Sequence, residues 1–100
     1  FKDADLARAA KAAQGAIFAN AGQSCTAGSR LLVERPVYDK VVDWVAQGAQ
    51  RLKVGAPLDP ATEVGPVQNA KQHAHVLAMI EAARSEGARL VAGGGRPACV

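Results

Sequence analysis

Cys25 is the residue in this sequence best suited to covalent chemistry. It lies within residues 22–29, a run of small and polar residues typical of a loop, so its sulfur is expected to be accessible and near several backbone N–H groups. N–H dipoles or a nearby cation make a thiol nucleophilic, and the same N–H groups stabilise an oxyanion on the carbonyl that the sulfur attacks. Judged from the residues alone, the alternative is that Cys25 acts as a small apolar side chain and packs under a helix.

The other metal-ligating and thiol residues give weaker signals. Cys25 and Cys99 stand far apart with no CxxC pair and no zinc-ligand spacing, so no metal site is expected and a reducing, cytoplasmic setting is favoured. Cys99, next to the C-terminus, is interpreted as a bystander. His73 and His75 are two positions apart in an expected helix, which turns their side chains roughly 200° from each other and prevents them from sharing a metal ion.

Composition and charge exclude several classes of partner. The chain has 100 residues, enough for one domain at most, with 12 Lys and Arg against 9 Asp and Glu. The basic residues have acidic neighbours and few aromatic residues accompany them, so nucleic acid is not expected as a partner. There is neither an apolar run of about 18 residues nor a signal-peptide pattern, so no membrane association is expected.

Cys25 is expected to follow a helix and to precede a strand. The helix begins at an N-cap at Asp3 or Asp5 and ends near Asn20, where Gly22 is a natural stop signal. Its apolar residues Leu6, Ala10, Ala13 and Ile17 have helical spacing and lie on one stripe of the helix. Residues 30–34 read as a short strand that Pro36 closes.

The rest of the chain predicts two more helices and a second strand. Hydrophobic spacing indicates a helix over residues 37–52, and residues 54–66 are too rich in Gly and Pro for regular helix. A third helix is expected over residues 68–86, with Gly87 after its end and a buried stripe of Val76, Met79, Ile80 and Ala83. Residues 89–92 resemble a strand. The order helix, strand, helix, helix, strand indicates an α/β fold.

Two segments carry a family resemblance. Residues 18–33, FANAGQSCTAGSRLLV, resemble the active-site cysteine segment of the aldehyde dehydrogenase superfamily. Residues 53–60, KVGAPLDP, followed by Gly65, Pro66 and Gln72, resemble the turn-rich segment that this family carries after its cysteine. The resemblance covers essentially the whole chain and implies that residues 1–100 are a partial catalytic domain, a fragment of an aldehyde dehydrogenase-like α/β domain without its dinucleotide-binding domain.

The resemblance assigns Cys25 the role of catalytic nucleophile, with its own N–H as one oxyanion donor. It implies that the parent enzyme oxidises an aldehyde substrate to a carboxylic acid through a thiohemiacetal and a thioester on Cys25, with NAD or NADP as hydride acceptor. The NAD(P) site, the general base and the remaining oxyanion donor belong to segments outside this chain, so the isolated chain is expected to be inactive. The partners implied are the remainder of the parent enzyme and, because the family forms dimers and tetramers, further copies of the parent as a homo-oligomer.

Two alternatives stay open at this point. The parent enzyme could be an acylating aldehyde dehydrogenase that passes its thioester to coenzyme A, since nothing in these residues distinguishes that outcome from hydrolysis. The chain could instead be a small, non-catalytic interaction domain in which Cys25 is packed. The polar, glycine-containing loop around Cys25 is poor packing material and argues against the second alternative.

Overall fold

The computed structural model describes residues 1–97, and Cys99 lies outside this range. The described chain forms two compact units, residues 1–52 and the described part of residues 53–100. The first unit contains α1 (Leu6–Phe18), the short 3-10 turns η1 (Ala19–Gly22) and η2 (Arg35–Val37), and α2 (Tyr38–Arg51). The second contains α3 (Ala70–Ser85). The three expected helices are therefore confirmed.

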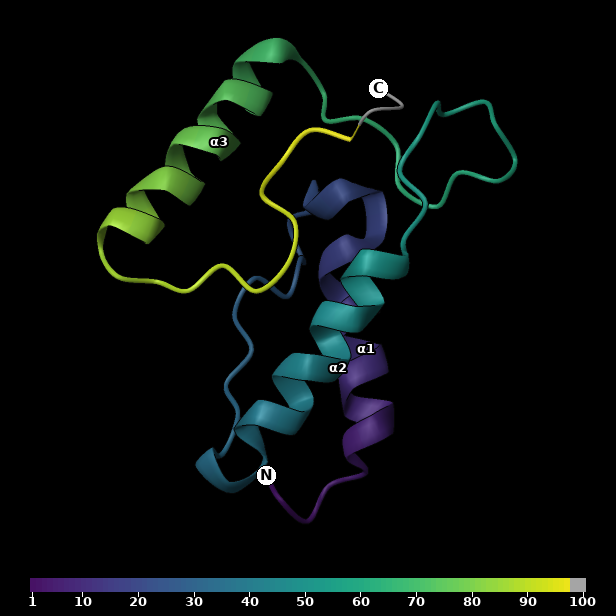
Figure 1. Ribbon diagram of the computed structural model, residues 1–100. Helices are drawn as coiled ribbons and strands as arrows, with labels where there is room; N and C mark the ends of the chain where they lie inside the picture. Colours follow the sequence, from purple (N-terminus) through teal and green to yellow (C-terminus); the bar gives the residue numbers. More distant parts are fainter. Residues whose placement is uncertain (98–100) are drawn as a thin grey trace. The chain divides into compact units, whose positions relative to one another are not determined.

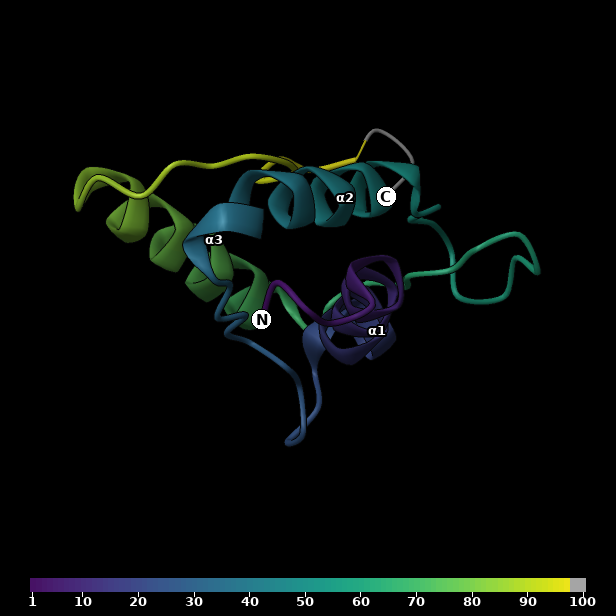
Figure 2. The same ribbon diagram turned by 90° about the horizontal axis from the view of Figure 1, so that it is seen from below.

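Helices α1 and α2 pack against each other and form the core of the first unit. The α1 N-cap is Asp5, whose side chain accepts a hydrogen bond from the Arg8 backbone N–H. Figures 1 and 2 show the two helices side by side with their axes crossing obliquely, and both begin at the same end of the unit because the intervening segment returns to that end. Ala10 on α1 and Val41 on α2 are buried, with 2% and 4% of their surfaces exposed. A small residue on α1 thus lets the helices approach closely.

A polar contact and a glycine fix the helix pair above this core. The Gln14 side-chain amide donates to the backbone carbonyl of Trp44 at 3.1 Å. Gly48 is buried, and a Cβ at this position would overlap the Gln14 amide. The Lys40 ammonium lies 4.7 Å from the centre of the Trp44 ring and covers the side of that ring. The Trp44 carbonyl and Gly48 therefore lie on the side of α2 that faces α1.

The two expected strands are not formed, which corrects the predicted order of elements. Residues 30–34 and 89–92 have no strand assignment, and the described residues contain a single isolated parallel bridge, Val54 to Val64. A strand is held by hydrogen bonds to a neighbouring strand. Each unit contains one of these two segments and, among the described residues, no second extended segment paired with it. Their β-branched and apolar residues give strand propensity, but propensity without a pairing partner does not make a sheet.

The turn-rich segment 53–66 is an ordered loop closed at its base. Lys53 O accepts from the backbone N–H groups of Glu63 and Val64, and the Gly55 N–H donates to Val64 O. Within the loop the Asp59 carboxylate accepts from the Ala61 N–H at 2.8 Å. Figure 1 shows this segment as an open loop that follows α2 and precedes α3 along the chain. The segment is thus an ordered connection and not a helix, and its Gly and Pro content predicted the absence of helix.

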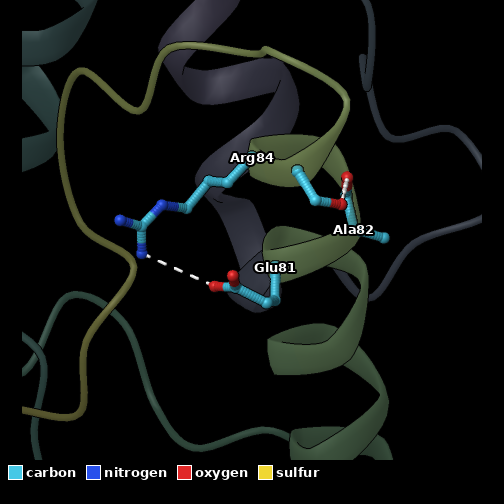
Figure 3. Close-up of polar contacts among 4 residues, drawn as sticks. Glu81, Ala82 and Arg84 are labelled. Carbon is cyan, nitrogen blue, oxygen red and sulfur yellow. Dashed lines mark hydrogen bonds and ion pairs between the residues drawn. The ribbon is translucent and has the colours of Figure 1, made fainter.

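Helix α3 is capped at both ends by its own local sequence. The Asn69 side chain accepts from the Gln72 N–H at the start. At the end, Gly87 has φ +95° and donates to Arg84 O, while Ala88 donates to Ala83 O, which is a Schellman motif. Figure 3 shows the last turn, where Arg84 pairs with Glu81 at 3.6 Å and the Ser85 hydroxyl donates to Ala82 O. Both side chains of the ion pair are exposed, so this pair contributes little stability.

We expect Gly87→Ala to destabilise α3 by about 1 kcal/mol, because a side chain is disfavoured at φ +95°. Gly95→Ala is the matched control, since Gly95 has no positive φ and open space around its Cα. Amide hydrogen exchange of α3 peptides measures the difference. Equal exchange in the two variants would contradict the C-cap assignment.

The predicted buried stripe on α3 is wrong in the described structure. No residue of this helix is buried, Val76 and Ala83 are exposed, and Met79 is 57% exposed, while Ile80 is half-buried. The apolar residues have helical spacing, but the described part of the second unit offers no second helix for them to pack on. The described residues form no helix that is both long and apolar enough to cross a membrane.

Candidate active-site loop

Cys25 lies on an exposed loop that follows α1, as the sequence predicts. The loop spans residues 19–29, and Cys25 is an exposed free thiol at its outer turn. An exposed sulfur contradicts the interpretation in which Cys25 is packed under the first helix. No group of three His, Cys, Asp or Glu residues in the described chain is arranged to hold a metal ion.

The loop leaves α1 through three consecutive left-handed residues. Asn20, Ala21 and Gly22 have φ values of +53°, +55° and +73°. Asn and Gly tolerate this region, whereas for Ala it costs roughly 1 kcal/mol. The Gln23 N–H closes the turn by donating to Asn20 O at 3.1 Å, and the side chains of the same two residues add two more hydrogen bonds. The end of the helix before Gly22 agrees with the prediction from the sequence, whereas the pairing of Asn20 with Gln23 was not predicted.

Cys25 occupies the corner of a second turn. The Ala27 N–H donates to Ser24 O at 3.2 Å across Cys25, and the Thr26 N–H donates to the Ser24 hydroxyl at 3.3 Å. The hydroxyls of Ser24 and Thr26 lie 3.1 Å apart, one on each side of the cysteine in sequence. The Cys25 N–H donates to none of the described residues, although the N–H groups of Thr26 and Ala27 are engaged. The turn therefore leaves this one donor beside the sulfur available.

Gly28 fastens the far end of the loop to α1. Its N–H donates to Ala16 O at 2.9 Å, and Ala16 O is one of the last four helix carbonyls, which have no partner inside the helix. A Cβ on Gly28 would lie 3.1 Å from the Ala16 Cβ. The loop therefore starts and ends on the last turn of α1, which limits how far Cys25 moves.

Gly28→Ala is expected to loosen this attachment, while Gly15→Ala is expected to stabilise α1. At Gly28 the added methyl is too close to Ala16, so the hydrogen bond lengthens and the unfolding free energy falls by about 1 kcal/mol. Gly15 lies inside the helix with no atom within 4 Å of an added Cβ, so alanine gains about 1 kcal/mol of helix propensity. Thermal unfolding measures both variants. A stabilising effect at both positions would refute the close approach at Gly28.

The arrangement can present a nucleophile and one oxyanion donor to a carbonyl. No side chain in the described residues hydrogen-bonds to the Cys25 sulfur, so the loop itself contains no general base in place. The described residues also lack a strand that leads through a glycine-rich turn into a helix, which is the arrangement that binds a dinucleotide pyrophosphate. The described residues thus supply an exposed sulfur with one available N–H group beside it.

The chain is similar in sequence and fold to parts of known proteins. Retinal dehydrogenase 2 of Mus musculus is 46% identical over 94 residues, which are 94% of this chain and 18% of the mouse protein. HpcC of Thermus thermophilus is 47% identical and superposes with a TM-score of 0.92 over 95% of this chain and 18% of its own. Aldehyde dehydrogenase C (AldC) of Pseudomonas syringae, solved as a cysteine-to-alanine variant with NAD+ and octanal, is 41% identical with a TM-score of 0.93.

These matches cover nearly all of this chain and a small part of the relatives. AldC aligns over 98% of this chain and 20% of its own length, so the chain spans about a fifth of the proteins that it matches. The fold of the described residues is therefore that of one part of those larger proteins. Residues 1–99 match the model of the aldehyde dehydrogenase family, and the chain belongs to that family.

Proposed function

We propose that Cys25 is the catalytic nucleophile of an NAD(P)-dependent aldehyde dehydrogenase of which this chain is one part. The observation that carries the proposal is an exposed thiol on a loop attached at both ends to α1, whose own N–H is unpaired among the described residues. Family membership supports an aldehyde as substrate. The complex of AldC with octanal and NAD+, obtained with a cysteine replaced by alanine, supports the same substrate class and cofactor.

The proposed first step forms a bond between Cys25 Sγ and the aldehyde carbon. The thiolate supplies the electron pair, the carbonyl π bond breaks, and its electrons go to the oxygen to give a thiohemiacetal oxyanion. The Cys25 N–H is placed to donate to that oxygen, and a fixed donor needs no reorganisation as the charge develops. NAD(P) supplies the hydride acceptor when bound by the parent protein. After loss of the hydride, Cys25 holds the acyl group as a thioester, and sulfur is a good leaving group toward water.

We further propose that residues 1–100 are a partial catalytic domain, and that the dinucleotide-binding domain lies elsewhere in a cytoplasmic, homo-oligomeric parent protein. This division accounts for the absence of a nucleotide-binding turn among the described residues. It predicts that the isolated chain does not oxidise aldehydes. Transfer of the acyl group to coenzyme A is the second candidate for the last step, because the group that accepts the acyl chain does not alter the role of Cys25.

The proposal is tested by grafting residues 1–97 into AldC in place of its matching segment. This graft carries Cys25 and excludes Cys99. With octanal and NAD+, we expect intact mass spectrometry after rapid acid quenching to detect an octanoyl adduct, and peptide mapping to place it on Cys25. When coenzyme A is added to the same mixture, release of octanoic acid or of octanoyl-coenzyme A separates the two candidates for the last step in the grafted enzyme.

The control is the same graft with Cys25→Ala. It should bind NAD+ as the unaltered graft does and should form no adduct. An adduct that persists in the alanine variant, or one that maps to another residue of the graft, would overturn the assignment of Cys25. NAD+ binding by both proteins verifies that the grafted enzymes are folded.

A further inference from the structure

Asn20 and Gln23 form a reciprocal clamp at the entrance to the cysteine loop. The Gln23 N–H and the Gln23 side-chain amide both donate to Asn20 O, at 3.1 and 3.2 Å. The Asn20 side-chain amide donates in the opposite direction, to Gln23 O at 3.0 Å. The two residues are thus joined by three hydrogen bonds, which we call the Asn20–Gln23 clamp.

The clamp restricts the orientation of the peptide that leads to Cys25. Gln23 O belongs to the peptide unit between Gln23 and Ser24, so a hydrogen bond to this oxygen fixes the plane from which the next turn begins. That next turn is the one whose Ser24 O accepts from the Ala27 N–H across Cys25. Downstream, the Gly28 hydrogen bond to Ala16 O holds the other side. Without the clamp, the upstream side of the turn would lose the side-chain hydrogen bonds that orient it.

The clamp also accounts for the strained backbone around it. Asn20 and Ala21 both adopt left-handed conformations, although only the first is a residue that tolerates them well. Asn20 is exposed, so its hydrogen bonds replace equivalent bonds to water and yield little net stability. Strain retained at the surface for little gain in stability is expected where a particular conformation is needed.

We propose that Asn20 and Gln23 are positioning residues that hold the Cys25 turn with its sulfur and N–H group directed toward an incoming carbonyl. This inference rests on the proposed role of Cys25. The side-chain amide of Asn20 is the essential donor, and its left-handed backbone alone is not sufficient. Gln23 supplies the returning donor. Loss of either side chain opens the clamp, so the two substitutions are not additive.

The test uses the full chain and the rate at which iodoacetamide alkylates Cys25, read by peptide mass spectrometry. N-acetylcysteine in the same tube is the reference thiol. In native buffer the normalised Cys25 rate is expected to differ from its value in urea by about fivefold, because the held turn fixes the directions from which the reagent can reach the sulfur. Asn20→Asp and Asn20→Gly both retain a residue that tolerates the left-handed conformation, but both lack the amide donor.

Asn20→Asp, Asn20→Gly and Gln23→Met are each expected to bring the Cys25 alkylation rate to within about twofold of the value in urea. Their far-UV circular dichroism should be unchanged. A variant that combines an Asn20 substitution with Gln23→Met should change the rate no more than either single substitution. Gln47→Met is the matched control, because it removes a glutamine hydrogen bond to Asp43 on the exposed face of α2. The proposal would be overturned if the unaltered chain reacted at the same rate in buffer and in urea. It would also be overturned if Asn20→Gly reacted as fast as the unaltered chain, or if Gln47→Met changed the rate as much as the clamp variants do. If the AldC graft forms no octanoyl adduct while these alkylation rates behave as expected, the role of Cys25 as nucleophile is refuted. The role of the Asn20–Gln23 clamp in holding the turn would then stand.

Discussion

Replacing Cys25 with serine in the AldC graft is expected to lower kcat/KM for octanal by about 10³-fold or more. The serine hydroxyl is nearly the same size as the thiol, so the turn around it is retained. A hydroxyl is ionised far less than a thiol at neutral pH, and the ester that it would form transfers its acyl group less readily than a thioester. The increase in NADH absorbance over a range of octanal concentrations measures kcat/KM. The affinity for NAD+ should be unchanged.

Ser29→Ala is the control for this substitution. Ser29 lies in the same loop, and its hydroxyl donates only to Ala27 O, at 3.4 Å. We expect kcat/KM to change by less than about threefold, because an exposed hydrogen bond of this length contributes little. A Cys25→Ser graft that keeps activity within about tenfold of the unaltered graft would remove Cys25 from the chemistry. A similar loss in Ser29→Ala would show that the loop tolerates no change, and the serine result would then carry no chemical meaning.

The helices could be predicted from the sequence because their signals are local. Asp5 caps α1 and Gly87 ends α3, and both depend on contacts within a few residues. The strands could not, because a strand requires a partner that a local pattern does not reveal. Residues 30–34 and 89–92 have strand-like composition and lie in different units with no partner strand in the described chain. The predicted burial of the apolar residues of α3 is wrong for the same reason, because helical spacing does not reveal which element packs against them.

The exposed position of Cys25 could be predicted from the sequence, whereas the contacts that hold its loop could not. A cysteine among small and polar residues indicates an exposed thiol, and the structure places it there. The Asn20–Gln23 clamp requires left-handed backbone at Asn20 and Ala21, and alanine gives no sign of that conformation. The available signal was an Asn three positions before a Gln with Gly22 between them, since both side chains carry a donor and an acceptor. The attachment of Gly28 to Ala16 O depends on the path of the whole loop.

Val41→Asp is expected to unfold the first unit. Val41 is 4% exposed and packs between α1 and α2, and the described part of the chain has one other buried hydrophobic side chain, Ala10. A carboxylate at this position would lose most of its hydration, which costs about 3 kcal/mol or more beyond the lost apolar burial. So few buried residues cannot absorb such a loss, because the net stability of a small domain is only about 5 kcal/mol. Thermal unfolding by far-UV circular dichroism is expected to lose its cooperative transition.

The charge itself is controlled with Gln50→Asp, an exposed position on the same helix, where we expect a change below about 1 kcal/mol. Val41→Ala isolates the loss of packing and is expected to cost about 2 kcal/mol. The loss of unfolding free energy should therefore increase from Gln50→Asp to Val41→Ala to Val41→Asp. These three variants report, respectively, the effect of an exposed charge, of a cavity and of a buried charge. If Val41→Asp melts like Gln50→Asp, the α1–α2 contact is not what holds this unit together, and the loop attached to the end of α1 must be held in some other way.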